Sequence, residues 1–144
     1  MDIVIFPDER LRKKAKRVIL NEIKSPKIKK LINEMGRLML EQDGIGLAAP
    51  QVGMSKRLII VATQTGVAVF INPKILSRSW KKETAEEGCL SVPGRSIRVR
   101  RSTKITVEFY DMNAEKQELN ATGLFARVLQ HEIDHLDGIL IIDK

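Results

Sequence analysis

The sequence predicts an α+β fold in which mainly antiparallel β-sheets pack around a C-terminal helix. Hydrophobic periodicity places one helix early in the chain and one near its end, and the segments between them alternate as strands do. Consecutive strands that do not alternate with helices are typical of α+β domains. No repeat, low-complexity tract or Gly/Ser linker divides the chain, so we expect residues 1–144 to form a single domain.

The first helix is predicted to begin at Ser25-Pro26, because serine is a good N-cap and proline fits the first helical position. An apolar stripe follows at helical spacing, and the helix is expected to end near Asp43-Gly44. The segment GIGLAAPQ, residues 44–51, is predicted to be a glycine-rich loop. Two strands, RLIIVAT and VAVFINP, are expected to join around Thr65-Gly66.

Alternation between residues 96 and 107 predicts further strands, and another strand pair is expected to turn at residues 111–113. The last helix is predicted to begin near Thr122 and to end at Gly138. Its inward-facing residues are expected to be Leu124, Phe125, Val128, Leu129 and Leu136. The final apolar residues, ILIID, are expected to pack against the core, because the six residues after Gly138 are too few for a projecting helix.

The net charge of +7 is concentrated in residues 10–17, 24–30 and 95–104. Aromatic residues make up only 4% of the chain and are not interleaved with these clusters, so we interpret them as solvated surface and expect no specific DNA partner. The first 18 residues lack an apolar run long enough for a signal peptide or a membrane span. We therefore expect a cytoplasmic protein without a membrane partner, and an organellar location stays open.

The motif HEIDH, residues 131–135, contains both histidines of the chain. Histidines four residues apart lie on one face of a helix, so that both rings can contact one metal ion. Glu132 falls in an otherwise apolar stripe, where a carboxylate is costly unless it is paired or used. Burial would raise its pKa toward the range of a general acid or base.

Two histidines leave a catalytic metal site one protein ligand short of the usual three. Cys89 is the better candidate, because thiolate binds borderline divalent ions and Gly88 allows close approach of the backbone. Asp137 and Asp143 stay open as ligands, although Asp137 follows His135 by only two residues and should face away. A buried structural thiol is the alternative for Cys89.

The segment GIGLAAPQ lacks the spacing of a dinucleotide-binding fingerprint and the Lys-Ser/Thr of a phosphate loop, and a simple turn is its plainest interpretation. Its last residue, Gln51, carries a neutral amide that can donate a hydrogen bond to a developing oxyanion without competing for a metal.

Together, GIGLAAPQ, EGCLS and QHEIDH resemble, in order and approximate separation, the three signature motifs of the peptide deformylases. The resemblance covers nearly the whole chain, and EGCLS is similar to the form of the bacterial and organellar class. It implies that Cys89, His131 and His135 bind one divalent ion with a water in the fourth place. Family members typically use Fe²⁺ and tolerate Zn²⁺, Ni²⁺ or Co²⁺.

The resemblance further implies a hydrolase that removes the N-formyl group from the formylmethionine of nascent polypeptides. Metal-bound hydroxide would attack the formyl carbon, while Glu132 would take the water proton and return it to the leaving amine. The side chain of Gln51 and the backbone N–H of Leu90 would hold the oxyanion. Gly46, which has no side chain, would leave room for the formyl group.

The substrate peptide is implied to pair as a short strand along the GIG segment. Ile45, Leu124 and Val128 would wall an apolar methionine pocket, and Gly88 would also contact the substrate. Asp43 and Arg101 occupy positions where the family tends to place an acid and an arginine, so a supporting ion pair is expected there, with an ordinary surface role for either as the alternative.

Many family members continue into a C-terminal helix, which in some helps docking on the ribosome, whereas this chain stops at Lys144. Any ribosome association is therefore expected to be weak and electrostatic. Two other functions stay open. A metallopeptidase of the HExxH type is disfavoured by the missing downstream ligand, and a catalytically inactive basic binding module is disfavoured by the intact Glu132 and Gln51.

Overall fold

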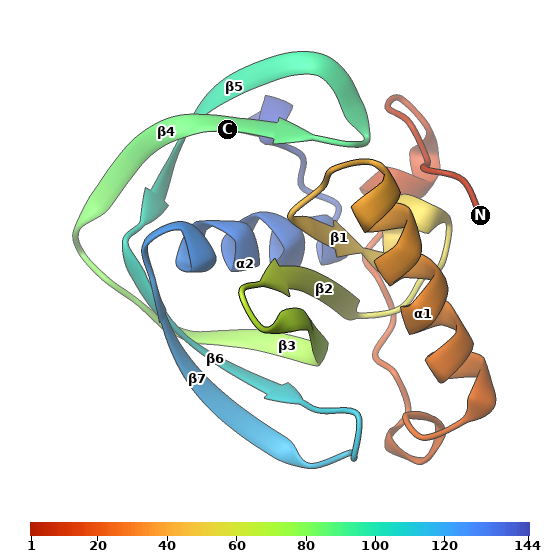
Figure 1. Ribbon diagram of the computed structural model, residues 1–144. Helices are drawn as coiled ribbons and strands as arrows, with labels where there is room; N and C mark the ends of the chain where they lie inside the picture. The colour runs from red at the N-terminus through yellow and green to blue at the C-terminus, as the bar shows by residue number, and fades with distance from the viewer.

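The computed structural model describes residues 1–144 and confirms the α+β class (Figure 1). Helix α2 runs through the middle of the molecule, with β4 and β5 on one side of it and β2, β3, β6 and β7 on the other. The elements are α1 (Pro26–Glu41), β1 (Gly46–Ala48), β2 (Leu58–Thr63), β3 (Gly66–Arg78), β4 (Lys82–Cys89), β5 (Val92–Ser102), β6 (Lys104–Tyr110), β7 (Lys116–Thr122) and α2 (Gly123–Leu136). Four short 3₁₀ helices lie at Glu9–Arg12, Leu20–Glu22, Ala49–Val52 and Ile141–Asp143.

Both sheets are antiparallel, as predicted. One has five strands in the order β1-β2-β3-β6-β7, and the other is the β4-β5 pair. The expected turns are present, because Thr63 pairs with Gly66 and Tyr110 pairs with Lys116. Strand β4 was not predicted, since its sequence KETAEEGC is polar and does not alternate; its pairing with β5 holds it in the extended conformation.

The prediction that residues 44–51 form a loop is wrong in part. Residues Gly46–Ala48 form strand β1, which pairs with Ile59–Val61 of β2, and the 3₁₀ helix follows directly. Three residues are too few to show alternation, so the strand is defined by its partner rather than by its own sequence. The strand is at the edge of its sheet and has one unpaired side.

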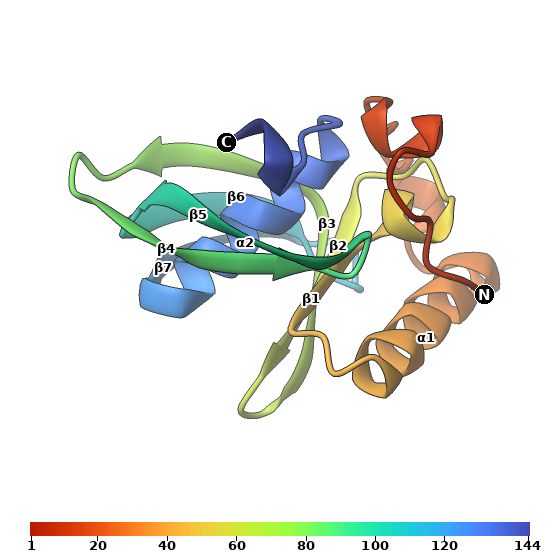
Figure 2. The ribbon, with the colours of Figure 1, turned by 90° about the horizontal axis from the view of Figure 1, so that it is seen from above.

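The core lies on both faces of β2. Ile59 and Val61 pack toward α2, whereas Leu58 and Ile60 pack toward α1. Figure 2 shows the two helices on either side of β1 and β2. Neither helix has the combination of length and apolar character that a membrane span requires.

Two expectations about the C-terminal part have different outcomes. Leu140 and Ile141 are buried, and Leu140 packs with Val4 and Leu11, so the end of the chain does pack against the core. The prediction that Leu124 faces inward is wrong, because its side chain is 67% exposed in the first turn of α2. Leu124 instead lines a cleft.

Candidate metal centre and active site

Three potential metal ligands converge between β4 and α2. The Sγ atom of Cys89 and one ring nitrogen from each of His131 and His135 all lie within 4.8 Å of one another. Sγ is 3.3 Å from Nε2 of His135, and both rings are buried. One thiolate and two imidazoles suit a borderline divalent ion and leave a fourth place open. The donor set therefore fits the expected metal.

The two aspartates that the sequence left open as ligands lie away from this cluster. Asp137 accepts a hydrogen bond from Arg57 at 3.0 Å, and Asp143 pairs with Arg12. Each carboxylate is already engaged by an arginine, so the structure places Cys89 rather than either aspartate beside the histidines.

Glu87 is a buried residue of the site that was not predicted from the sequence. Its Oε1 atom lies 2.8 Å from Nδ1 of His131, and its carboxylate also accepts hydrogen bonds from Arg101 and Arg127. Burial tends to raise the pKa of Glu87, but the bonds to His131 and Arg101 outweigh it and lower the pKa to about 2. No signal in the sequence indicated Glu87, because strand β4 was not predicted and its pairing with β5 is irregular between Glu87 and Cys89.

The predicted ion pair between Asp43 and Arg101 is wrong. Nε and Nη2 of Arg101 donate to Glu87 at 2.6 and 2.9 Å, and its Nη1 donates to Asp134 at 2.8 Å. Asp43 is instead exposed just after α1. Pairing of β4 with β5 places Arg101 above α2, so that the nearer acids are those of β4 and α2.

Glu132 is buried beside the ligand cluster without a hydrogen-bond partner for its Oε1 atom. Its Oε2 atom lies 3.9 Å from Nε2 of His131. Burial raises the pKa of Glu132 to about 7, although the nearby charges of His131 and Arg101 act to lower it. A carboxylate with a near-neutral pKa beside a set of metal ligands is suited to proton transfer.

The two histidines differ in basicity. Burial lowers the pKa of His135 well below its usual value, and the charge of His131 adds to this effect. For His131, burial is outweighed by the charge of Glu132 and by hydrogen bonds to Cys89 and Glu87, which raise its pKa to about 10. Because a metal binds the unprotonated ring, a cation and a proton compete for His131.

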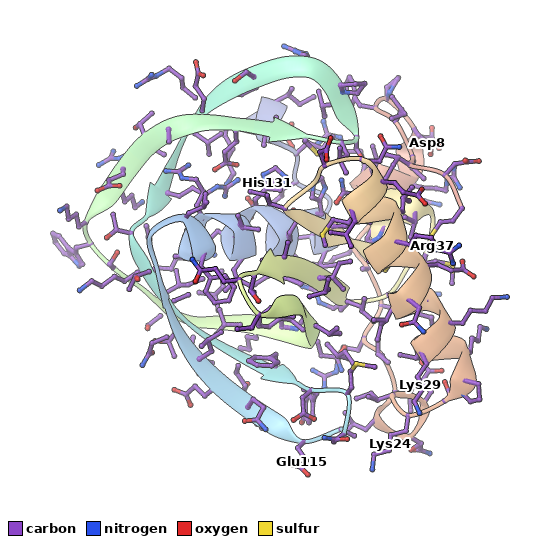
Figure 3. All side chains as sticks on the ribbon, in the orientation of Figure 1. Asp8, Lys24, Lys29, Arg37, Glu115 and His131 are labelled. Atoms are coloured by element: carbon purple, nitrogen blue, oxygen red, sulfur yellow. The ribbon has the colours of Figure 1, made fainter.

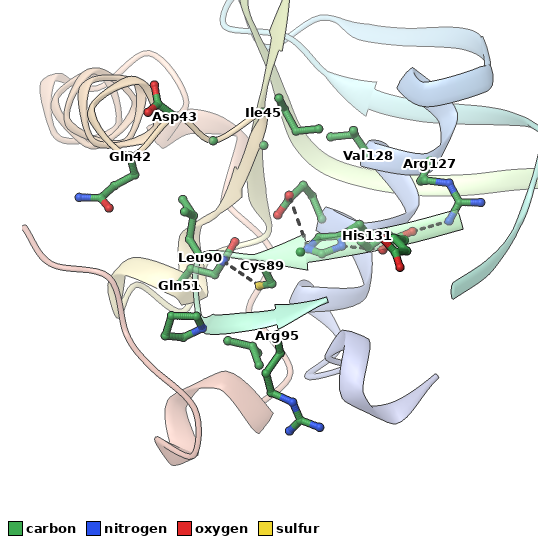
Figure 4. Close-up of a pocket in the computed structure, with 18 of the residues that line it drawn as sticks. Gln42, Asp43, Ile45, Gln51, Cys89, Leu90, Arg95, Arg127, Val128 and His131 are labelled. Atoms are coloured by element: carbon green, nitrogen blue, oxygen red, sulfur yellow. Dashed lines mark hydrogen bonds and ion pairs between the residues drawn. The ribbon is translucent and has the colours of Figure 1, made fainter. Parts of the chain in front are cut away.

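A cleft of about 580 Å³ opens over Glu132 (Figure 4). It brings together nearly all the residues predicted to act in catalysis or in binding: Ile45, Gly46, Gln51, Gly88, Cys89, Leu90, Leu124, Val128, His131 and Glu132. Ile45 and Leu124 are 52% and 67% exposed, so the cleft presents apolar surface to an incoming ligand. His135 lies beneath the cleft and does not line it.

The amide of Gln51 has a fixed orientation in this cleft. Its Oε1 atom accepts a hydrogen bond from the Ala48 N–H at 2.9 Å, which directs Nε2 toward Ser91 Oγ at 3.1 Å and Cys89 Sγ at 3.6 Å. Leu90 occupies the tight turn between β4 and β5, and its backbone N–H has no acceptor within the chain. The Gln51 amide and the Leu90 N–H therefore both lie next to Cys89, one of the three candidate metal ligands.

Gly46 allows β1 to pass close to α2. A Cβ atom at this position would lie 2.6 Å from Oε2 of Glu132 and 2.9 Å from Cγ1 of Val128. Part of the space that was expected to receive a formyl group is therefore filled by the Glu132 carboxylate. At Gly88, by contrast, a Cβ atom would meet no neighbour.

Comparison with known proteins identifies relatives over the full length of the chain. The family model for polypeptide deformylase matches residues 1–144. A peptide deformylase of Thermodesulfovibrio yellowstonii is 48% identical over 149 residues, covering 100% of this chain and 88% of that protein. The peptide deformylase structure from Thermotoga maritima has a TM-score of 0.94 at 44% identity, with 99% of this chain and 95% of that chain covered. The Met-Ala-Ser-bound class I type b enzyme of Acinetobacter baumannii has a TM-score of 0.95 at 37% identity, with 99% and 96% covered.

Proposed function

The chain belongs to the peptide deformylase family, and from this premise we propose that Cys89, His131 and His135 hold its catalytic metal ion. The protein is a metal-dependent hydrolase that removes the N-formyl group from N-formylmethionyl nascent peptides. One observation carries the assignment of the site. A thiolate and two imidazoles converge beside Glu132, a buried carboxylate that lacks a hydrogen-bond partner on Oε1.

The ion in this proposal is Fe²⁺, with Zn²⁺, Ni²⁺ or Co²⁺ as substitutes, as the resemblance to the family implies. When bound, the ion acts as a Lewis acid and lowers the pKa of a water molecule into the neutral range. Glu132 accepts a proton from the attacking water and then delivers it to the amine nitrogen that leaves. Its raised pKa and its position 3.9 Å from His131 support this role.

The oxyanion that develops on the formyl oxygen is held by two donors in this proposal. Nε2 of Gln51 and the N–H of Leu90 lie on either side of Cys89. The contact of Nε2 with Sγ of Cys89 is long, at 3.6 Å, and the N–H of Leu90 has no acceptor in the chain, so both can donate to the oxyanion. Loss of one such donor costs about 3 kcal/mol of transition-state stabilisation in comparable enzymes.

The peptide is bound along the unpaired side of β1, where backbone hydrogen bonds give affinity with little dependence on sequence. Its methionine side chain lies against the apolar wall made by Ile45, Leu124 and Val128, and Gly88, which also lines the cleft, is a further contact.

Residues 1–144 act as one domain in the cytoplasm, and any contact with the ribosome is electrostatic, as the charge of +7 suggests. The comparisons favour neither a metallopeptidase nor an inactive binding module.

Formate release from formyl-Met-Ala-Ser tests the proposal, with acetyl-Met-Ala-Ser and casein as competing substrates. We expect the formyl peptide to be hydrolysed far faster than the acetyl peptide, because the crowded space around Gly46 and Glu132 has little room for an added methyl group. Comparable rates on both peptides, or cleavage inside casein, would contradict the assigned site.

A further inference from the structure

A second cleft, of about 370 Å³, lies outside the active site and has a strongly cationic lining. Four of its nine residues are basic, namely Arg17, Arg57, Lys74 and Arg78, and it shares no residue with the cleft over Glu132. Its one carboxylate, Asp137, is already paired with Arg57. The cleft is thus concave and carries an excess of three positive charges. Such a cleft is suited to binding phosphate groups.

The cationic lining continues into the turn between β3 and β4. The segment 78–82, RSWKK, has three basic residues and no acid, and Lys104 adjoins it, because its carbonyl oxygen accepts a hydrogen bond from the Ser79 N–H. None of Arg78, Lys81, Lys82 and Lys104 forms an ion pair with a carboxylate, in contrast to Arg101 and Arg127 nearby. A polyanion could therefore follow the surface from the cleft to this turn.

Trp80 stands at the tip of this turn and is 100% exposed. An indole without any packing partner is unusual on a folded surface, because it leaves the largest apolar side chain in water. An exposed aromatic ring beside unpaired cations is the combination that binds single-stranded nucleic acid, in which cations contact the backbone and the ring stacks on a base. The three basic clusters at residues 10–17, 24–30 and 95–104 contain no aromatic residue, whereas the separate segment 78–82 has one between its basic residues.

We propose that the cationic cleft and Trp80 form a binding surface for a single-stranded segment of ribosomal RNA, with phosphates in the cleft and one unpaired base stacked on the indole. The choice of RNA rests on the proposed function, since nascent peptides emerge from an RNA-rich particle. An anionic membrane fits less well, because a flat surface cannot reach into a cleft to the half-buried Arg57.

The cationic cleft shares no lining residue with the cleft over Glu132, and Trp80 is separated from Cys89 by the length of β4. Strand β4 begins at Lys82, next to Trp80, and ends at Cys89. Seven residues of extended chain span roughly 23 Å at about 3.3 Å per residue. Figure 1 shows the β3–β4 turn at the edge of the molecule opposite α1. RNA held there would leave the cleft over Glu132 open to a peptide.

Trp80 is the only tryptophan of the chain, so fluorescence excited at a wavelength that tyrosine does not absorb reports on this turn alone. Titration of the protein with an unstructured RNA oligonucleotide should quench the fluorescence, whereas duplex RNA should quench it less, because its bases are already stacked. Affinity should fall by roughly twentyfold between about 50 and 200 mM salt if about three phosphates are contacted.

The variants Trp80→Ala and Lys74→Glu/Arg78→Glu should each weaken binding of a labelled RNA by about tenfold or more. The matched control is Lys29→Glu/Arg37→Glu, which changes the net charge equally but lies on the exposed side of α1 (Figure 3). The control should retain at least half of the affinity. Co-sedimentation with ribosomes should follow the same order.

Formate release is measured on every variant and should be unchanged, which separates this inference from the proposed function. RNA affinity that is equal in Trp80→Ala and in the wild type would overturn the proposal, as would equal losses in the two charge-reversal variants. A blue shift of Trp80 on anionic vesicles without quenching by RNA would assign the surface to a membrane instead and would also overturn it.

Discussion

Nδ1 of His131 lies 2.8 Å from Oε1 of Glu87, so a carboxylate on β4 fixes the orientation of a ring on α2. With Nδ1 engaged, Nε2 faces Glu132 and the ligand cluster. Arg101 and Arg127 hold the carboxylate in turn. The proposed metal site is thus supported by a buried ionic network as well as by its three ligands.

Replacement of Glu87 by glutamine tests this support. Glu87→Gln keeps the shape of the side chain but removes the charge that orients His131 and balances two arginines, so metal affinity should fall by about 10- to 100-fold. Competition with a chelator of known affinity measures the change. The matched control is Glu86→Gln, which alters the exposed neighbouring acid and should leave affinity unchanged. Equal affinities in the two variants would remove Glu87 from this role.

Glu132→Gln separates metal binding from chemistry. The variant keeps all three proposed ligands, so it should bind one ion per chain, but kcat should fall by at least about a hundredfold because the amide cannot accept the water proton. Metal analysis and formate release on the same preparation give both quantities. A variant that is fully loaded with metal and retains near-normal kcat would exclude Glu132 as the proton carrier.

Gly46→Ala should impair both activity and stability. The new Cβ atom would lie 2.6 Å from Oε2 of Glu132, so either the carboxylate or the strand must move. Gly36→Ala in α1 is the matched control, since a Cβ atom there meets no neighbour and alanine should stabilise the helix by about 0.5–1 kcal/mol. Thermal melts and formate release measure the two effects. Full activity in Gly46→Ala would show that the close approach of β1 and α2 is not needed.

The C-terminal segment should have a pH-dependent contribution to stability through Asp143. Arg12 holds the pKa of this carboxyl below its usual 3.8. Asp143 therefore stabilises the folded state above pH 4, and this contribution is lost as the pH falls through the lowered pKa. Asp143→Asn should reduce the free energy of unfolding at pH 7 by at most about 1 kcal/mol, because the pair is partly exposed.

Denaturation of wild type and Asp143→Asn at pH 7 and at pH 3 measures this difference, with Asp2→Asn, at the exposed N-terminus, as the control. The difference should shrink at the lower pH. A difference that grows as the pH falls would contradict the assigned pairing with Arg12.

The ends of α1 and α2 and the hairpin turns could be predicted because local signals define them. Ser25 caps α1, and Gly138 adopts a φ of 75° just after α2, a conformation that favours glycine. Strands β1 and β4 could not be predicted in this way. Each is held by its partner strand, and neither three residues nor the polar run KETAEEGC has a pattern of its own.

In the candidate site, too, some features could be predicted from local sequence, whereas others depend on tertiary contacts. Histidine spacing on α2 and the chemistry of a lone cysteine were sufficient to nominate the ligand cluster. The pairing of Arg101 with Glu87 rather than with Asp43 depends on how β4 and β5 lie over α2, which is tertiary information. The role of Gly46 likewise depends on the distance between β1 and α2.

Metal content and turnover of anaerobically purified wild type and Cys89→Ser test the central claim most directly. The wild type should contain one divalent ion per chain and release formate from formyl-Met-Ala-Ser, with activity that decays in air if the ion is Fe²⁺. Cys89→Ser should lose most of both, because a neutral hydroxyl replaces the thiolate. A folded Cys89→Ser variant that keeps one tightly bound ion and normal formate release would contradict the proposed metal centre.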